Sequence, residues 1–87
     1  MNEKEIDEST CRRIIAFSVD SEFVAAEFEL KDVTLEDLRN QFGFQESDPC
    51  LLDAYRVEQK HQTWIELHSE QKLDFNKYRY FLDYYVK

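Results

Sequence analysis

Two histidines, His61 and His68, are the first residues of this sequence that could do chemistry, as metal ligands or as general acids and bases. They are seven residues apart, which on a helix is about two turns, or roughly 10 Å along the axis. One zinc ion cannot join side chains held that far apart, and no cysteine pair lies nearby to complete a site. We therefore expect no metal site, and predict that both histidines flank a buried helical stripe of Trp64 and Ile65.

Cys11 and Cys50 are candidates for a nucleophile or a disulfide. A catalytic cysteine needs a base and an electropositive environment. Arg12 and Arg13 follow Cys11, but Cys50 lies in an acidic part of the chain. Because no export signal opens the sequence, we expect a cytoplasmic location with free thiols.

Paired carboxylates are the third candidate for chemistry. Glu27 and Glu29 share the outward face of a predicted strand, where both stay solvated, whereas a general acid has to be desolvated. The sequence has no glycine-rich phosphate loop, nucleophile elbow or dinucleotide fingerprint. We therefore expect a protein with no catalytic residue and no cofactor.

The charge is strongly acidic and unevenly distributed. Lys and Arg number 11 and Asp and Glu 19, for a net charge of −8, and residues 20–53 contain ten acids but only two bases. An acidic surface repels nucleic acid and anionic lipid and attracts basic partners, although it also serves to keep small proteins soluble. We expect no nucleic acid and no membrane as partners. The opposite view rests on possible base-stacking tyrosines, Tyr78, Tyr80, Tyr84 and Tyr85.

The elements that must position these residues are organised around the segment 78–86. Its aromatic and β-branched residues favour a strand. Tyr80 and Leu82 alternate with Phe81 and Asp83, so neither face is wholly polar. The pattern predicts a central strand that is covered in part on both sides.

Two earlier segments predict a β-hairpin. Residues 13–19 alternate as a strand with one well-buried face, and Asp20-Ser21-Glu22 supplies turn residues. Residues 24–31 have the cleanest alternation in the chain, with charged residues outward and apolar residues inward. The inward residues are Val24, Ala26, Phe28 and Leu30.

A helix follows from residue 35, with Thr34 as its cap and Asp37 approximating a capping box. Gly43 and Phe44 predict a Schellman stop. After a loop over residues 45–49, residues 51–57 predict a third strand and residues 58–70 a second helix.

These elements predict one α+β domain over residues 11–87, preceded by a flexible arm over residues 1–10. The order is β-β-α-β-α-β. It favours a four-stranded, mostly antiparallel sheet with two helices on one face and the other face partly solvated.

Several short motifs follow one another over most of residues 13–84. They are Leu38-Arg39, Phe42-Gly43, Asp48-Pro49, Tyr55-Arg56-Val57, Asp74-Phe75, Tyr78 and Tyr80-Phe81-Leu82-Asp83. In this order and spacing they resemble a family of small bacterial domains of unknown function found among immunity proteins of polymorphic toxin systems, including contact-dependent growth inhibition.

The resemblance implies a cytoplasmic immunity protein that neutralises one cognate toxin and has no catalysis of its own. The net charge independently favours a partner with a basic surface, such as a nuclease, whose groove binds a polyanion. On this hypothesis seven carboxylates contact the toxin: Glu27, Glu29, Glu36, Asp37, Glu46, Asp48 and Asp53.

Some of these carboxylates have a local explanation as well. Glu36 and Asp37 suit the start of a helix, and Asp48 suits a turn. The alternative functions are a non-toxin adaptor, a module that dimerises through strand edges, and a DNA mimic of the anti-restriction type. In isolation we expect a monomer or a weak homodimer.

Overall fold

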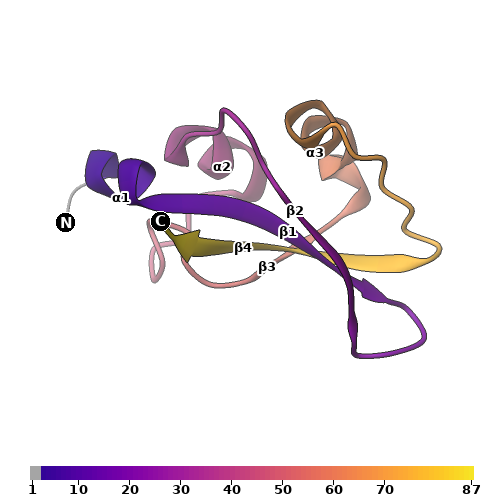
Figure 1. Cartoon of the computed structure of the whole chain (residues 1–87). Coiled ribbons are helices and arrows are strands. Elements are labelled where there is room, and N and C mark those ends of the chain that lie inside the picture. The colour runs from indigo at the N-terminus through magenta and orange to yellow at the C-terminus, as the bar shows by residue number, and fades with distance from the viewer. Residues whose placement is uncertain (1–2) are drawn as a thin grey trace.

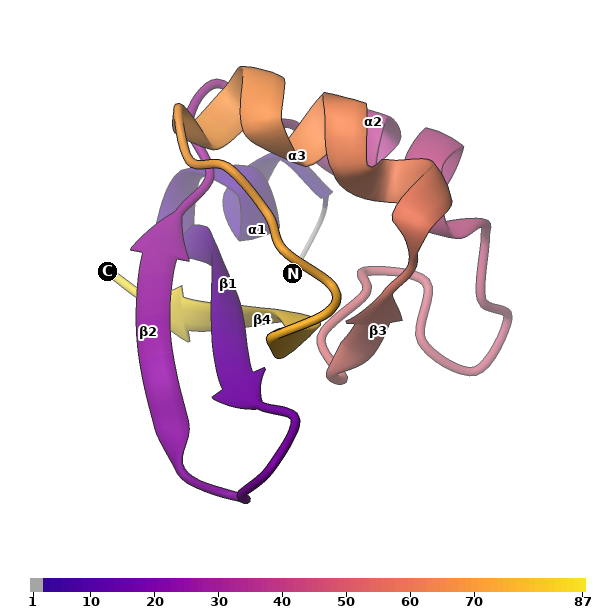
Figure 2. The ribbon, with the colours of Figure 1, turned by 90° about the vertical axis from the view of Figure 1, so that its right-hand side faces the viewer.

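A four-stranded sheet in the order β2-β1-β4-β3 forms the centre of the molecule (Figures 1 and 2). The computed structural model describes residues 3–87. All three strand pairings are antiparallel, so the predicted α+β class with an antiparallel sheet is confirmed. The strands are β1 Thr10–Ser18, β2 Val24–Glu29, β3 Tyr55–Val57 and β4 Tyr78–Val86.

Strand β4 is central, as its composition predicts. It lies between β1 and β3 and pairs with β1 along its whole length, from Thr10 opposite Val86 to Ser18 opposite Tyr78. Leu82, in the middle of β4, is fully buried. The last strand of the chain therefore joins the first hairpin to the short strand β3.

The helices differ in number from the prediction. A helix α1, Glu3–Ser9, precedes β1, so the observed order begins with a helix and the predicted order β-β-α-β-α-β is incomplete. The other helices are α2, Leu35–Phe42, and α3, Gln62–Ser69, with a 3-10 turn η1 at Gln59–His61. No helix among the described residues is long and apolar enough to cross a membrane.

Helix α1 occupies most of the segment predicted to be a flexible arm. It lies at one end of the sheet (Figure 1), with Ile6 buried and the Thr10 hydroxyl donating to the Ile6 carbonyl at 2.5 Å. Met1 and Asn2 of that arm lie outside the described residues. Because α1 leads into the start of β1, the predicted arrangement of two helices on one face leaves out a third helix.

One face of the β1–β4 pair forms the main core with α2 and α3. Ile14 of β1 and Leu82 of β4 belong to the same buried cluster as Leu38 of α2 and Ile65 of α3, and each is 0% exposed. We call this sheet face, which carries Ile14, Ala16, Tyr80 and Leu82, the covered face. The alternate residues of the same strands form the opposite, uncovered face.

The ends of α2 follow the sequence signals in part. The Thr34 hydroxyl accepts from the Asp37 N–H at 3.2 Å, and the Asp37 carboxylate accepts from the Thr34 N–H at 3.0 Å, so the capping box is confirmed. Gly43 has a positive φ of +85° as expected, but its ψ of 156° lies outside the left-handed helical region, so the predicted Schellman geometry is wrong. The predicted apolar contact of Phe44 is wrong, because its ring is 63% exposed and lies under the Arg39 guanidinium.

The third strand is shorter than predicted, because its first half is a loop. Only Tyr55–Val57 pairs with β4, whereas Leu51 has a left-handed φ of +51° and a buried side chain. The Asp48 carboxylate accepts from the N–H groups of Leu52 and Asp53, both at 2.9 Å. Those two N–H groups therefore cannot enter the sheet ladder.

Strand β2 is the clearest departure from the predicted burial. The register of the β1–β2 hairpin is antiparallel as expected, but Ala26 is exposed and Val24 is 53% exposed. Figure 1 shows the reason: the hairpin extends beyond the helices, so nothing covers its far end. Of the four residues predicted to point inward, only Phe28 and Leu30 contact or join the core.

Candidate functional site: the uncovered sheet face

The uncovered face has an apolar centre built from neighbouring strands. Ile15 and Phe17 of β1 and Phe81 of β4 are half-buried, and β1 pairs Ile15 directly with Phe81. The Phe17 and Phe81 rings meet edge to face with their centroids 5.7 Å apart. Aromatic rings in this geometry attract one another beyond the effect of buried area, so the centre of the face is a preformed surface.

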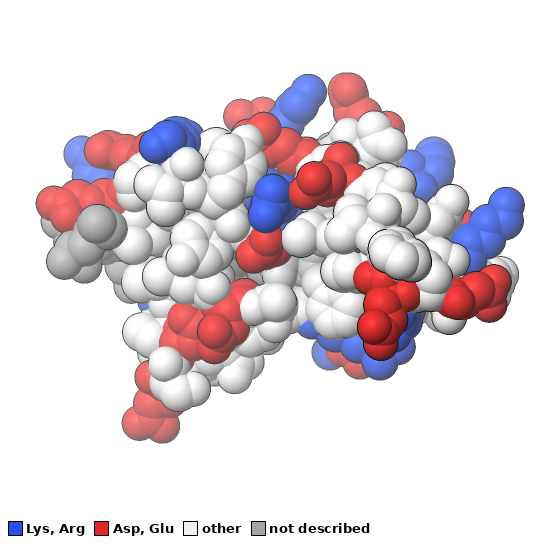
Figure 3. All heavy atoms as spheres, turned by 60° about the horizontal axis from the view of Figure 1, so that its bottom comes forward, with Lys and Arg blue, Asp and Glu red and all other residues white. Residues whose placement is uncertain are grey.

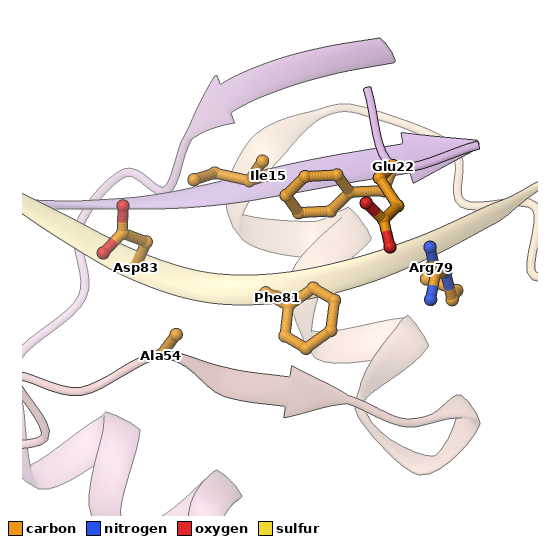
Figure 4. A pocket seen from close by; sticks show the side chains of 7 residues that line it. Ile15, Glu22, Ala54, Arg79, Phe81 and Asp83 are labelled. Atoms are coloured by element: carbon orange, nitrogen blue, oxygen red, sulfur yellow. The ribbon is translucent and has the colours of Figure 1, made fainter. Parts of the chain in front are cut away.

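A hollow of about 420 Å³ lies over this apolar centre (Figure 4). Charged side chains border it: Asp83 lies at one end, and Glu22 and Arg79 lie at the other. Arg79 also donates to the Ser21 carbonyl at 3.2 Å, which ties β4 to the hairpin turn. The full lining is Ile15, Phe17, Glu22, Ala54, Arg79, Phe81 and Asp83.

Arg13 connects the carboxylates of two strands across this face. Its guanidinium donates to the Asp83 carboxylate at 2.9 Å and 3.2 Å, and lies 3.2 Å from a carboxylate oxygen of Glu27. The same guanidinium lies over the Tyr85 ring, 5.5 Å from its centroid. The charges of β2 and β4 are therefore partly balanced within the face.

Tyr85 forms the other polar link to β2. Its hydroxyl donates to the Glu29 carboxylate at 3.1 Å. Hydrogen bonds with Cys11 and with Glu29 raise the pKa of Tyr85 to about 12. The tyrosine therefore remains a neutral donor over the physiological pH range.

The seven carboxylates predicted to bind a partner do not form one patch. Glu27 and Glu29 lie on β2, at one edge of the sheet, whereas the acids of the 46–53 loop precede β3, at the opposite edge. Figure 3 shows acidic and basic side chains interspersed with uncharged ones over the face that it displays. The remaining members, Glu36 and Asp37, lie at the start of α2.

Two of the seven carboxylates are occupied within their own segments. Asp37 completes the α2 cap. Asp48 accepts from the Tyr55 hydroxyl as well as from two loop N–H groups. Burial alone raises the pKa of Asp48, but these hydrogen bonds outweigh it and lower the pKa. Burial, and then the bond to Asp48, raises the pKa of Tyr55 to about 12.

The other five carboxylates are exposed. Besides Glu27 and Glu29 they are Glu36, Glu46 and Asp53, of which Glu27 also contacts Arg13 and Glu29 also contacts Tyr85. Their role in partner binding stays a prediction. The register places Glu27 and Glu29 on the uncovered face, because β1 pairs them with Ile15 and Arg13.

The two histidines are held in separate structural contacts. His61 is buried, stacks on Phe42, accepts from the Glu58 N–H at 2.9 Å and donates from Nε2 to the Gln41 carbonyl at 3.0 Å. Burial lowers the pKa of His61. His68 lies beside Trp64, with Nδ1 3.0 Å from the Lys31 carbonyl oxygen.

No metal-ligating cluster of three His, Cys, Asp or Glu side chains occurs within residues 3–87. Cys11 and Cys50 are free thiols on different segments, β1 and the loop before β3. The tyrosines proposed for base stacking do not form one exposed row, because Tyr80 is buried and only Tyr85 is more than a third exposed. The cysteines and tyrosines therefore either pack in the structure or lie too far from one another to form a common site.

Residues 11–83 match a family described as a domain of unknown function (DUF7683). The chain belongs to this family. No curated protein and no solved structure matches it. The match covers all four strands except the ends of β1 and β4, so the DUF7683 domain includes the uncovered face.

The uncovered face of this DUF7683 domain combines apolar contact area with paired charges. Such a surface can bind a partner, since apolar area supplies affinity and charges fix orientation. The sequence indicates this apolar surface in part, because Ile15, Phe17 and Phe81 alternate with core residues. The alternation within each strand does not reveal the site, because the pairing of β1 with β4 brings these residues together.

Proposed function

We propose that this domain acts by binding another protein through the uncovered sheet face. The observation that carries the proposal is the half-buried apolar centre of Ile15, Phe17 and Phe81 under an open hollow, bordered by Arg79 and Asp83. Protein interfaces have this composition, with aromatic and arginine side chains at the centre and a polar rim. The proposal assigns the domain no catalytic step and no cofactor.

The partner that we propose is the toxin of a bacterial competition system, so that the domain serves as its immunity protein in the cytoplasm of the producing cell. The resemblance of the motifs supports this role. The net charge of −8 supports a partner with a basic surface, such as a nuclease. Exposed Glu27 and Glu29, which adjoin the uncovered face, are the acids best placed to contact it.

The test is co-expression with the C-terminal domain of a large toxin-like reading frame adjacent to the gene. We expect the wild-type protein to restore growth and to co-purify with the toxin domain. In Ile15→Lys/Phe81→Glu the two new charges lie directly opposite each other and have unlike signs, so we expect this variant to do neither while keeping its circular dichroism spectrum. As the matched control, Thr63→Lys adds a charge at an exposed position of α3 and should protect like the wild type. Failure of the wild-type protein to bind the toxin domain refutes the immunity role.

A non-toxin adaptor is the second candidate. The observation that favours it is the mixed charge of the uncovered face, where Arg13, Arg56 and Arg79 lie among the carboxylates. Such a face does not require a basic partner. Affinity capture from the producing strain with the wild type and with Ile15→Lys/Phe81→Glu as baits separates the two, because an adaptor captures a protein other than the toxin through the same residues.

A further inference from the structure

Strand β2 leaves one edge of the sheet without a neighbour. It is the terminal strand in the order β2-β1-β4-β3, and Figure 2 shows no helix or strand beyond its outer side. On the opposite edge β3 has only three residues, whereas β2 has six. Long open edges invite the addition of another strand.

The register shows which backbone groups of β2 are available. The Leu30 N–H donates to the Arg12 carbonyl at 2.8 Å, so Leu30 and Arg12 form a hydrogen-bonded pair. In an antiparallel ladder such pairs alternate, so Phe28 and Ala26 also face β1 with their N–H and C=O groups. The N–H and C=O groups of Glu27 and Glu29 therefore point outward, away from β1.

The side chains of the same two residues define the charge of this edge. Glu27 and Glu29 project on the uncovered face, and Glu27 is 53% exposed at its side chain. On the other side of the strand lie exposed Ala26 and half-buried Phe28. An added strand next to β2 thus meets carboxylates on one face and apolar side chains on the other.

A second copy of this chain does not fit this edge. In the second copy, too, the outward N–H and C=O groups of β2 belong to Glu27 and Glu29. Antiparallel pairing of the two β2 strands about a twofold axis therefore places one carboxylate opposite another. Like charges directly opposite each other destabilise a strand pair, whereas opposite charges stabilise it. The edge therefore selects a different chain that carries positive charge at alternate positions.

We propose that the outer edge of β2 binds an extended segment of the partner protein as a fifth strand, with basic side chains opposite Glu27 and Glu29 and apolar side chains against Ala26 and Phe28. This inference rests on the proposed protein-binding function and adds the mode of binding. The added strand extends the uncovered face sideways, so one partner can occupy both.

The probe is a short synthetic peptide in which lysine and valine alternate. Its control has the same composition with all lysines before all valines, and therefore the same charge without the alternation. We expect the alternating peptide to shift the amide NMR signals of β2 and to slow hydrogen exchange at the N–H groups of Glu27 and Glu29. The N–H of Phe28, already bonded to β1, should change little. Equal effects of the two peptides overturn the inference.

Matched variants test the edge itself. Glu27→Pro removes an outward N–H and leaves the ladder with β1 intact, so it should abolish peptide binding in a folded protein. Glu27→Ala removes the charge alone and should keep part of the binding. Glu27→Gln/Glu29→Gln should weaken binding about five- to tenfold, from the loss of two cross-strand charge pairs. Binding that survives Glu27→Pro refutes strand addition at β2.

Three further outcomes relate this inference to the proposed function. A dimer in sedimentation that Glu27→Pro dissociates assigns the edge to a second copy and overturns the inference. If the partner protein binds Glu27→Pro as tightly as the wild type but does not bind Ile15→Lys/Phe81→Glu, the inference fails and the proposed function stands. Loss of partner binding in both variants supports the two together.

Discussion

The two faces of the β1–β4 pair differ although they alternate residue by residue along the same strands. Ile14 and Leu82, on the covered face, are 0% exposed and pack against helices. Their neighbours Ile15 and Phe81 are apolar too, yet they lie half-buried on the uncovered face. Helix coverage, and not hydrophobicity, separates the residues that stabilise the fold from those available to a partner.

The polar groups differ between the faces in the same way. On the covered face Arg12 is buried and donates to the carbonyls of Leu51 and Cys50 at 2.6 Å and 2.9 Å. On the uncovered face its neighbour Arg13 forms solvent-exposed ion pairs with carboxylates. Arg12 therefore joins distant segments of the backbone, whereas Arg13 shapes a surface.

The sharpest test compares Leu82→Ala with Phe81→Ala. Truncation of a fully buried leucine leaves a cavity and should lower the free energy of unfolding by about 3 kcal/mol. Truncation of Phe81 should lower it by about 1 kcal/mol, since its ring already contacts solvent and opens no closed cavity. Urea unfolding measures both. Equal losses would place Phe81 in the core and remove the distinction between the faces.

The second test compares Arg12→Met with Arg13→Met. Loss of the Arg12 guanidinium leaves the Leu51 carbonyl as a buried acceptor without a donor. We therefore expect the unfolding free energy to fall by about 2 kcal/mol. Loss of Arg13 removes exposed ion pairs that contribute roughly 0.2–1 kcal/mol. Chemical denaturation decides between them. A larger effect at Arg13 contradicts the assignment of Arg12 as the structural arginine.

The pH dependence of stability tests the covered side through His61. Burial lowers the pKa of His61 below the ordinary value of 6.5, so the unfolded chain binds a proton first as the pH falls. The contribution of His61 to the unfolding free energy is therefore complete above about pH 6.5 and is lost as the pH falls below that value. In thermal melts between pH 7 and 5, His61→Gln should reduce this loss. A loss in His61→Gln as large as in the wild type would contradict this origin of the pH dependence.

The smallest effect is expected on the uncovered face. Asp83→Asn removes the ion pair between Arg13 and Asp83, in which the side chains are 31% and 26% exposed. The substitution should lower the unfolding free energy by about 0.5 kcal/mol in low salt. High salt should remove most of the difference from the wild type, because it screens exposed charges. A difference that persists in high salt means that the pair is structural. The measurement is unfolding free energy at two salt concentrations.

Local features were predictable because neighbours in the sequence produce them. The Thr34–Asp37 capping box, the positive φ of Gly43 and the alternation of Tyr78–Val86 all depend on residues within a few positions of one another. Helix α1 was missed because it has a single buried apolar residue, Ile6, and so no apolar stripe. The class of fold followed from these local patterns.

The candidate site was predictable only in part. Glu27 and Glu29 were identified as outward-facing acids, and the register confirms that they share one face. The seven carboxylates predicted to contact a partner do not share one surface, because those of β2 and of the 46–53 loop lie at opposite edges of the sheet. Nothing in the residues themselves shows which edge each will occupy.

Short-range sterics, hydrogen bonds and composition set the alternation of residues, the limits of α2 and the acidic charge, so all three follow from the amino acids alone. The covered face of β1 and β4, the short length of β3 and the open edge of β2 arise only in the folded molecule. These features depend on contacts between distant residues, such as the bond from Arg12 to Leu51, 39 positions apart. Such contacts exist only after folding has brought the distant residues together.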